Sequence, residues 1–252
     1  MCDDFLKIDL ESITAGLTHQ HGNLITLIKY CHTNNLKLIK PIFNLCKTHN
    51  NGKSLKSDLS EYYDIDNITI NGTLFPLYND DISIDYTIGK KKYECGLLTN
   101  DPLFKNLKPG YKILLQYHSD IYKIANNVRE ILGSYLCIHV RRGDKITTER
   151  IDIDTQPDNI NKIIRYHNQK KVYIMTNDKK TLEPIVDQNI GYRIFFYTDF
   201  DCLKNIDNNY YLFCIENLIM EFAVKRCSTF NTKTNLANNY YHSYLTEHAG
   251  WR

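Results

Sequence analysis

The stretch Ser134–Glu149, which reads SYLCIHVRRGDKITTE, decides how the fold of this chain is interpreted. Its first part, Tyr135–Val140, carries no charge and is typical of a strand buried on both faces. Charged residues follow at once, with Gly143 among them to let the backbone turn: Arg141, Arg142, Asp144 and Lys145. Ligands of open α/β sheets bind beyond the carboxyl ends of strands, so two guanidinium groups there indicate an anion such as a diphosphate. Glu149 is a candidate base.

Other interpretations of this stretch remain open at this point. Paired arginines after a strand are often a solvated turn, and His139 is compatible with an ordinary core histidine. The tripeptide Arg142–Asp144 also has the composition of an adhesion motif. Adhesion tripeptides usually lie at exposed loop tips, whereas this one directly follows an apolar strand, so adhesion ranks last of the three.

Composition sets the class of protein. The 252 residues suffice for one large or two small domains, and 42% hydrophobic with 24% charged residues is an ordinary globular composition. A net charge of +2 without a basic stripe argues against nucleic acid as a partner. The first residues, Met1–Lys7, are acidic where a signal peptide is basic, and no run approaches a membrane helix. The sequence therefore predicts a soluble, cytoplasmic protein with no membrane segment.

Cysteine and aspartate spacing gives no metal site. The 8 cysteines form no CxxC pair, which favours reduced thiols over a disulfide framework. A zinc set can be imagined from Cys31, His32, Cys46 and His49, but the spacing fits no standard zinc module. Asp64–Asp66 and Asp152–Asp154 fit the loose DxD pattern of metal-dependent glycosyltransferases, but such pairs arise easily in this composition. We therefore predict no cofactor and no metal.

The first half of the chain begins with a strand–loop–helix–strand pattern. A strand within residues 5–15 is followed by a polar loop, Gly16–Asn23, which either touches a ligand or only connects two elements. A helix from Leu24 to Tyr30 and a strand at Leu36–Lys40 complete a βαβ pattern. Residues 47–110 carry turn signals and indicate short strands and loops.

A long amphipathic helix is predicted to join the two halves. Apolar residues recur at steps of three and four between Tyr111 and Gly133, where the glycine is a plausible stop. We place a domain boundary there, giving an N-terminal α/β domain, 1–132, on the probable acceptor side. Residues 133–252 form the second predicted domain.

The second half alternates strands and helices. Further helices are predicted at Pro157–His167, from about Lys179, and at Tyr210–Lys225. Further strands are predicted at Lys171–Thr176, at Tyr192–Tyr197 and into Ser228–Phe230. This pattern is typical of a Rossmann-type domain, and polar groups follow three of its strands. The fold class is therefore α/β, and the three strand ends are candidates to line one crevice.

With these strand ends identified, the chain resembles the GDP-fucose-dependent fucosyltransferase superfamily, most closely the α1,6-fucosyltransferases. His139–Lys145, HVRRGDK, is similar to the first family motif, and Thr148–Glu149 continues the similarity. Val172–Asp178 resembles the second motif, although the family usually has two acids where this chain has Asn177 and Asp178. Thr229–Thr232 resembles the third motif, usually Thr-Phe-Ser-Ser, and Glu216 stands thirteen residues before Thr229, where the family carries an aspartate. The order and spacing of these motifs together make chance similarity unlikely.

The resemblance implies a GT-B-like fold with two Rossmann-type domains and the GDP-sugar site in the C-terminal one. It also implies inverting, metal-independent transfer of fucose from GDP-fucose to a glycan hydroxyl. The implied catalytic residues are Glu149 as base, Arg141 at the β-phosphate, Lys145 beside the base and Asp144 positioning the arginines. The implied substrate-binding residues are His139, Arg142, Asn177, Asp178, Glu216 at guanine, Ser228, Thr229, Phe230, Asn231, Thr232, Gly22 and Asn23.

Two rivals to this function remain. The departures at Asn177 and Glu216 permit a transferase that uses another nucleotide sugar. A protein that keeps the GDP pocket but has lost turnover is the alternative from a different class, and retention of both Arg141 and Glu149 argues against it. The acceptor, the linkage and the oligomeric state do not follow from the sequence.

Overall fold

The computed structural model describes two compact units of the chain. The described residues are 4–8, 10–79, 98, 103–104, 107, 110–142, 155–228, 230–231 and 236–237. Unit 1 comprises residues 1–121 and 208–211, and unit 2 comprises residues 122–207 and 212–252. The predicted division into 1–132 and 133–252 stays a prediction.

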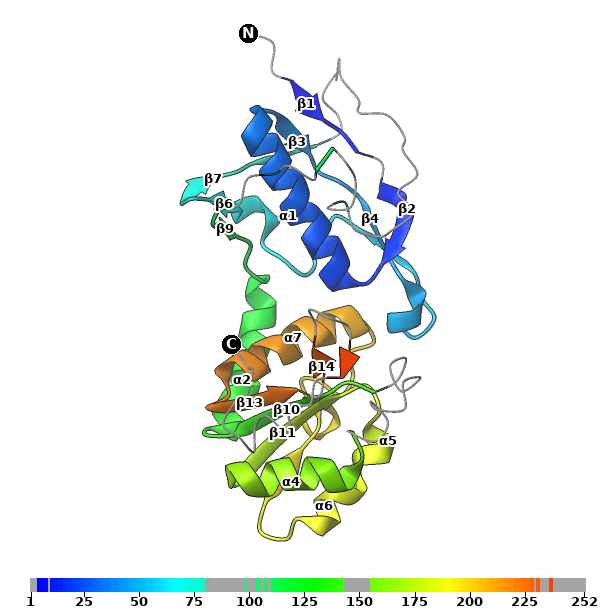
Figure 1. Cartoon of the computed structure of the whole chain (residues 1–252), viewed down its shortest axis with the longest axis vertical. Coiled ribbons are helices and arrows are strands. Elements are labelled where there is room, and N and C mark those ends of the chain that lie inside the picture. Colours follow the sequence, from blue (N-terminus) through cyan, green and yellow to red (C-terminus); the bar gives the residue numbers. More distant parts are fainter. Residues whose placement is uncertain are drawn as a thin grey trace. The chain divides into compact units, whose positions relative to one another are not determined.

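Unit 2 is built on a parallel sheet of four strands (Figure 1). The strands are β10 (Leu136–Val140), β11 (Lys171–Thr176), β12 (Arg193–Phe195) and β13 (Lys225–Ser228). Their order is β12-β11-β10-β13, and every neighbouring pair is parallel. Parallel sheets need both faces covered, which explains why β10 and β11 are almost continuously buried. The Rossmann-type alternation predicted for the second half is present in these elements.

Helices cover the two faces of this sheet (Figure 1). The helices of unit 2 are α4 (Pro157–His167), α5 (Lys179–Leu182), α6 (Pro184–Gln188) and most of α2 (Ser119–Leu132) and α7 (Asn209–Phe222). Ile160, Ile163 and Ile164 of α4 recur at helical spacing and are fully buried against the sheet. On the opposite face, the buried hydroxyl of Tyr135 donates a hydrogen bond to the Ile219 carbonyl of α7.

Alternation along the strands gives the two faces different chemistry. The apolar face packs on α4, α5 and α6 and contains Leu136, Ile138, Val140, Val172, Ile174 and Cys227. The intervening residues point to the α7 side, which we call the polar face: Cys137, His139, Tyr173, Met175 and Ser228. Their side chains are predominantly polar or titratable. The same strands therefore supply a core on one face and polar groups on the other.

Unit 1 combines one long helix with three small sheets. The helix is α1 (Leu17–Asn34), and the strands are β1 (Phe5–Leu6), β2 (Leu10–Ala15), β3 (Lys37–Ile39), β4 (Phe43–Leu45), β5 (Leu55–Ser57), β6 (Thr69–Ile70), β7 (Thr73–Leu74), β8 (Leu77–Tyr78) and β9 (Ile113–Leu114). The sheet orders are β1-β3-β8, β2-β4-β5 and β7-β6-β9. Parallel pairing occurs in the first sheet and between β2 and β4. Unit 1 is thus also α/β.

The start of α1 corrects one prediction. The loop predicted at Gly16–Asn23 is wrong, because the helix already begins at Leu17. The Gly16 carbonyl accepts the first helical hydrogen bonds, and the amide of Asn23 donates to Oε1 of Gln20 at 2.9 Å, with both side chains fully buried. Polar residues at these positions hid the helix, because their pairing inside unit 1 replaces the apolar contacts that the sequence pattern requires.

A further helix prediction is wrong at its start. The helix predicted from Tyr111 begins only at Ser119, because Ile113 and Leu114 pair with β6 as strand β9. In contrast, the helix predicted from about Lys179 is confirmed at its start as α5, and Pro184, which lacks the N–H that a continuous helix needs, starts α6 after it. The bounds predicted for α4 and β11 are also confirmed.

The cysteines and the helices of the described part bear on the predicted class of protein. Cys31, Cys137, Cys214 and Cys227 are buried cysteines that form no disulfide. None of the helices in the ranges given above is both long enough and apolar enough to cross a bilayer.

Candidate functional site

The unit 2 sheet has one point where its strand order reverses. From β10 the chain passes to β11 and β12 on one side, and it then returns to place β13 on the other side of β10. The carboxyl ends of β10 and β13, which are parallel neighbours in the sheet, therefore lie at a topological switch point. In open α/β sheets this is the crevice in which ligands bind. We call the region at these two strand ends the β10–β13 crevice.

His139 and Ser228 meet at the β10–β13 crevice. They are register partners on neighbouring strands, and the Ser228 hydroxyl lies 3.2 Å from Nδ1 of His139. Burial, together with the Arg141 cation, lowers the pKa of His139 to about 4. The imidazole is therefore neutral at pH 7 and offers one donor and one acceptor nitrogen.

Arg141 is the first residue after β10. Its side chain is half-buried, and its positive charge is one cause of the lowered pKa of His139. A permanently charged guanidinium at the end of the strand that carries this neutral histidine is suited to a phosphorylated ligand. The structure therefore brings the predicted residues His139 and Ser228 together, and Arg141 follows at the end of the same strand.

Arg142 points elsewhere, although it is adjacent in sequence. It is only 4% exposed, and its Nε donates to Oδ2 of Asp178 at 2.9 Å. Its Nη1 donates to Oγ1 of Thr155 at 2.6 Å, and its backbone N–H donates to Oδ1 of Asn177 at 3.0 Å. The two arginines thus have different surroundings. Thr155, which is fully buried, was not among the predicted site residues, and nothing in its sequence context marks it.

Asn177 and Asp178 follow β11 and serve the turn that starts α5. Asp178 is the N-cap of α5, because Oδ1 accepts from the backbone of Thr181 and Oδ2 from its hydroxyl. Burial acts to raise the pKa of Asp178, but the hydrogen bonds from Arg142 and Thr181 outweigh it and lower this pKa. Asp178 is therefore an anion in an ion pair with Arg142.

Glu216 belongs to α7, and its side chain contacts the polar face of the sheet. It is only 7% exposed, and Oε1 accepts a 2.8 Å hydrogen bond from the buried hydroxyl of Tyr173. Burial raises the pKa of Glu216 to about 8, and the hydrogen bond from Tyr173 lowers it by less. Tyr173 was not among the predicted residues, and the signal for it was a hydroxyl inside an otherwise apolar strand. Contact of Glu216 with guanine stays a prediction.

The remaining predicted residues are divided between two groups. Asp144, Lys145, Glu149, Thr229 and Thr232 lie outside the described residues, whereas Phe230 and Asn231 form strand β14 (Phe230–Asn231), which pairs with β15 (Leu236–Ala237). Gly22 and Asn23 lie within α1 in unit 1, and Oδ1 of Asn23 accepts from the backbone N–H of Leu98 at 2.9 Å. The loop expected around these two residues is therefore absent. Their proposed contact with substrate stays a prediction.

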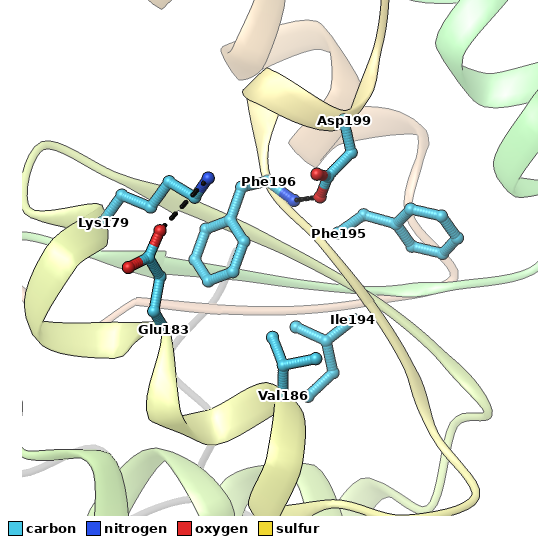
Figure 2. Close-up of a pocket in the computed structure, with 7 residues that line it drawn as sticks. All are labelled: Lys179, Glu183, Val186, Ile194, Phe195, Phe196 and Asp199. Atoms are coloured by element: carbon cyan, nitrogen blue, oxygen red, sulfur yellow. Dashed lines mark hydrogen bonds and ion pairs between the residues drawn. The ribbon is translucent and has the colours of Figure 1, made fainter.

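A pocket of about 330 Å³ lies at the outer edge of the sheet, beside β12 (Figure 2). It is lined by Lys179, Glu183, Val186, Ile194, Phe195, Phe196 and Asp199. Lys179 and Glu183 form an ion pair with 3.4 Å between Nζ and Oε1. Figure 2 shows these two side chains facing each other beside the ring of Phe196. Asp199 accepts from the backbone N–H of Phe196 at 2.7 Å. None of the predicted site residues lines this pocket.

The acidic groups of the described part include Asp64 from the first DxD pattern. Its two carboxylate oxygens accept hydrogen bonds from the Asn67 amide, at 3.0 and 2.9 Å. Among the residues that the structure describes, no cluster of three or more His, Cys, Asp or Glu has the arrangement of a metal site.

Comparisons with known proteins find similarity in structure only. No protein-family model matches the sequence, and no curated protein matches it. The structure is similar to POFUT1 solved in complex with GDP, with a TM-score of 0.53 and 8% identity over 94% of each chain. It is also similar to the α1,6-fucosyltransferase NodZ soaked with GDP-fucose, at 0.49 and 11% over 96% of this chain and 91% of that one.

A further similarity is to the fucosyltransferase NodZ from Bradyrhizobium. The TM-score is 0.49 with 10% identity, over 92% of this chain and 91% of that one. At such identities a likeness shows the fold alone, and the POFUT1 similarity is the one that supports it. The chain therefore has a mixed α/β fold with parallel sheets that matches the GT-B fold of POFUT1.

Proposed function

We propose that this protein is a glycosyltransferase that moves fucose from GDP-fucose to a glycan hydroxyl, with inversion and without a metal. The observation that carries the proposal is the grouping of Arg141, His139 and Ser228 at the topological switch point of unit 2. The fold match to POFUT1, solved in complex with GDP, supports this choice of nucleotide. The order of the three sequence motifs favours α1,6-fucosyltransferase-like chemistry over other fucosyl transfers.

The leaving group determines the role assigned to Arg141. When the bond between C1 of fucose and the β-phosphate oxygen breaks, negative charge develops on that phosphate. A guanidinium can hold phosphate oxygens by paired hydrogen bonds and does not lose its proton. Arg141 is assigned this role, because the Arg142 guanidinium is already bonded to Asp178 and Thr155.

Inversion requires a base on the acceptor side. The acceptor oxygen attacks C1 from the face opposite GDP, and its proton must be taken up as the new bond forms. By resemblance this base is Glu149, with Lys145 beside it and with Asp144 positioning the arginines. In the nucleotide pocket, neutral His139 and the hydroxyl of Ser228 are assigned to the donor. Glu216 and Thr229–Thr232 complete the proposed donor site, which Asn177 and Asp178 support from the turn after β11 by their hydrogen bonds with Arg142.

Calorimetric titration tests the nucleotide assignment. We expect GDP and GDP-fucose to bind equally well with and without EDTA, and UDP to bind more weakly. Arg141→Ala should weaken GDP binding roughly 10- to 100-fold, because charge-assisted hydrogen bonds contribute about 1.5–3 kcal/mol. Arg193→Ala, which removes the same side chain from an exposed position on β12, is the matched control and should leave GDP affinity unchanged.

A transfer assay tests the reaction. GDP-fucose and a panel of glycan acceptors should give a fucosylated product, whose linkage and anomeric configuration are read by NMR. Glu149→Gln should abolish transfer while leaving GDP affinity in place. Preference for a uridine nucleotide, or a requirement for a divalent metal, would overturn the proposal. GDP binding without transfer to any acceptor would favour a GDP-sugar-binding protein.

A further inference from the structure

The two turns that follow β10 and β11 are tied to each other by one side chain. Arg142, from the first turn, donates through Nε to Asp178 and through its backbone N–H to the Asn177 amide, both in the second turn. Its Nη1 donates to Thr155, which precedes α4. Three parts of unit 2 that are separate in sequence therefore converge on one guanidinium. We call Arg142, Asn177, Asp178 and Thr155 the arginine clamp.

Burial makes the arginine clamp rigid. The Arg142 side chain is 5% exposed and Thr155 is fully buried, so these hydrogen bonds are largely shielded from water. Asp178 is fixed in turn, because its oxygens also accept from the backbone and the hydroxyl of Thr181. Breaking one member would leave a buried donor or charge without its partner, which is costly.

The arginine clamp acts on Arg141 through the peptide bond that joins the two arginines. The N–H of this peptide bond donates to Oδ1 of Asn177. Because the peptide group is planar, this hydrogen bond fixes the orientation of the backbone between Arg141 and Arg142. The Arg142 side chain bonds on the side of α4 and α5. Because successive side chains alternate at a strand end, Arg141 is directed to the opposite side, where His139 lies at the β10–β13 crevice. The side chains of the two adjacent arginines are therefore directed to opposite sides of the end of β10.

We propose that Arg142 is a positioning residue, which with Asp178, Asn177 and Thr155 holds the end of β10 so that Arg141 is directed into the β10–β13 crevice. This rests on the proposed function to the extent that Arg141 binds the β-phosphate of GDP. Arg142 itself makes no contact with the nucleotide. Lysine cannot replace it, because one ammonium group does not reproduce the two directions in which Nε and Nη1 donate.

The test compares GDP with GMP, because only GDP carries the β-phosphate that Arg141 is assigned to bind. Titrations use the full chain and the variants R141A, R142K, D178N and T155V. We expect R142K, D178N and T155V to weaken GDP roughly 5- to 50-fold and GMP less than about 2-fold. T155S, which keeps the hydroxyl that accepts from Nη1, should restore GDP affinity.

A double-mutant cycle separates positioning from direct contact. If Arg142 acts through Arg141, adding R142K to R141A should weaken GDP less than about 2-fold further. Independent, multiplying losses would show that Arg142 contacts the phosphate itself and would overturn the proposal. Equal loss of GDP and GMP, with a lowered melting temperature, would show a purely structural role and would also overturn it. D201N, which removes the exposed ion pair with Lys204, is the control and should change neither affinity.

A ligand-free measurement distinguishes this proposal from the proposed function. If the wild-type chain binds neither GDP nor GMP, the nucleotide assignment fails. Hydrogen exchange measured by NMR still tests whether the arginine clamp orders the end of β10. The Arg142 Nε–H and the backbone amide of Arg142 should exchange slowly in the wild type and at least about tenfold faster in D178N and T155V. Unchanged exchange of that amide in D178N and T155V would show that the turn does not depend on the arginine clamp.

Discussion

The two faces of the unit 2 sheet differ in chemistry, although the same strands form them. On the apolar face, Ile138 and Ile174 pack with the isoleucines of α4. On the polar face, Tyr173 bonds to Glu216 and His139 to Ser228. The apolar face stabilises the fold because its side chains are removed from water. The polar face instead holds titratable groups whose pKa values are shifted by burial. The difference indicates that one face is for stability and the other is adapted to a ligand.

The largest effect is expected from a cavity on the apolar face. Ile174 is fully buried in the middle of β11. Ile174→Ala should lower the free energy of unfolding by about 2–5 kcal/mol at all pH values, because a buried cavity forms. Chemical denaturation measures this. Ile190→Ala, at a side chain that is 94% exposed, is the control and should change stability by less than about 0.5 kcal/mol.

Glu216 should make the protein less stable as the pH rises from 4.5 to 8. Its pKa is raised from 4.5 to about 8, so between these values the folded chain keeps a proton that the unfolded chain has released. The free energy of unfolding should therefore fall as the pH rises from 4.5 to 8, by a few kcal/mol at roughly 1.4 kcal/mol per pKa unit. Glu216→Gln should lack this fall. Parallel pH profiles for wild type and variant would contradict the assignment.

His139 should give the opposite pH dependence. Its pKa is lowered from 6.5 to about 4, so between these values the unfolded chain binds a proton that the folded chain excludes. The contribution to stability is complete above pH 6.5 and is lost as the pH falls towards 4, about 2–3 kcal/mol in all. The measurement is the difference in unfolding free energy between wild type and His139→Gln at pH 7 and at pH 4.5. A difference that stays constant would refute it.

Tyr173→Phe should have the smallest effect on stability, about 1 kcal/mol, because it removes one hydrogen bond and little volume. That hydrogen bond favours the ionised carboxylate, so its loss should move the alkaline transition of Glu216 to higher pH. Thermal melts across pH 6 to 9 test this. An unmoved transition would show that Tyr173 does not contact Glu216 in solution.

The local sequence pattern was sufficient to predict the boundaries of some helices and strands and insufficient for others. The bounds of α4 and β11 followed from helical spacing, an N-terminal proline and an apolar run, all of which act within one element. The start of α1 did not follow, because Gln20 and Asn23 are buried by pairing with each other. The strand β9 did not follow either, because its residues fit a helical pattern and its partner β6 is distant in sequence.

The candidate site shows the same limit. The sequence placed His139, Arg141, Arg142 and Asp178 at strand ends, and its order of motifs indicated a nucleotide-sugar site. It did not separate the roles of the two arginines or identify Thr155 and Tyr173. Their partners belong to other elements: Thr155 lies 13 positions from Arg142, and Tyr173 lies 43 positions from Glu216.

The sequence by itself determined the α/β class, the strand from which Arg141 and Arg142 follow, and the charge types available at its end. These depend on residue identity and on spacing within single elements. Only the tertiary structure decided that His139 meets Ser228 at the β10–β13 crevice while Arg142 is buried against Asp178. That choice depends on which strand lies on each side of β10, and strand order is set by packing across the whole unit.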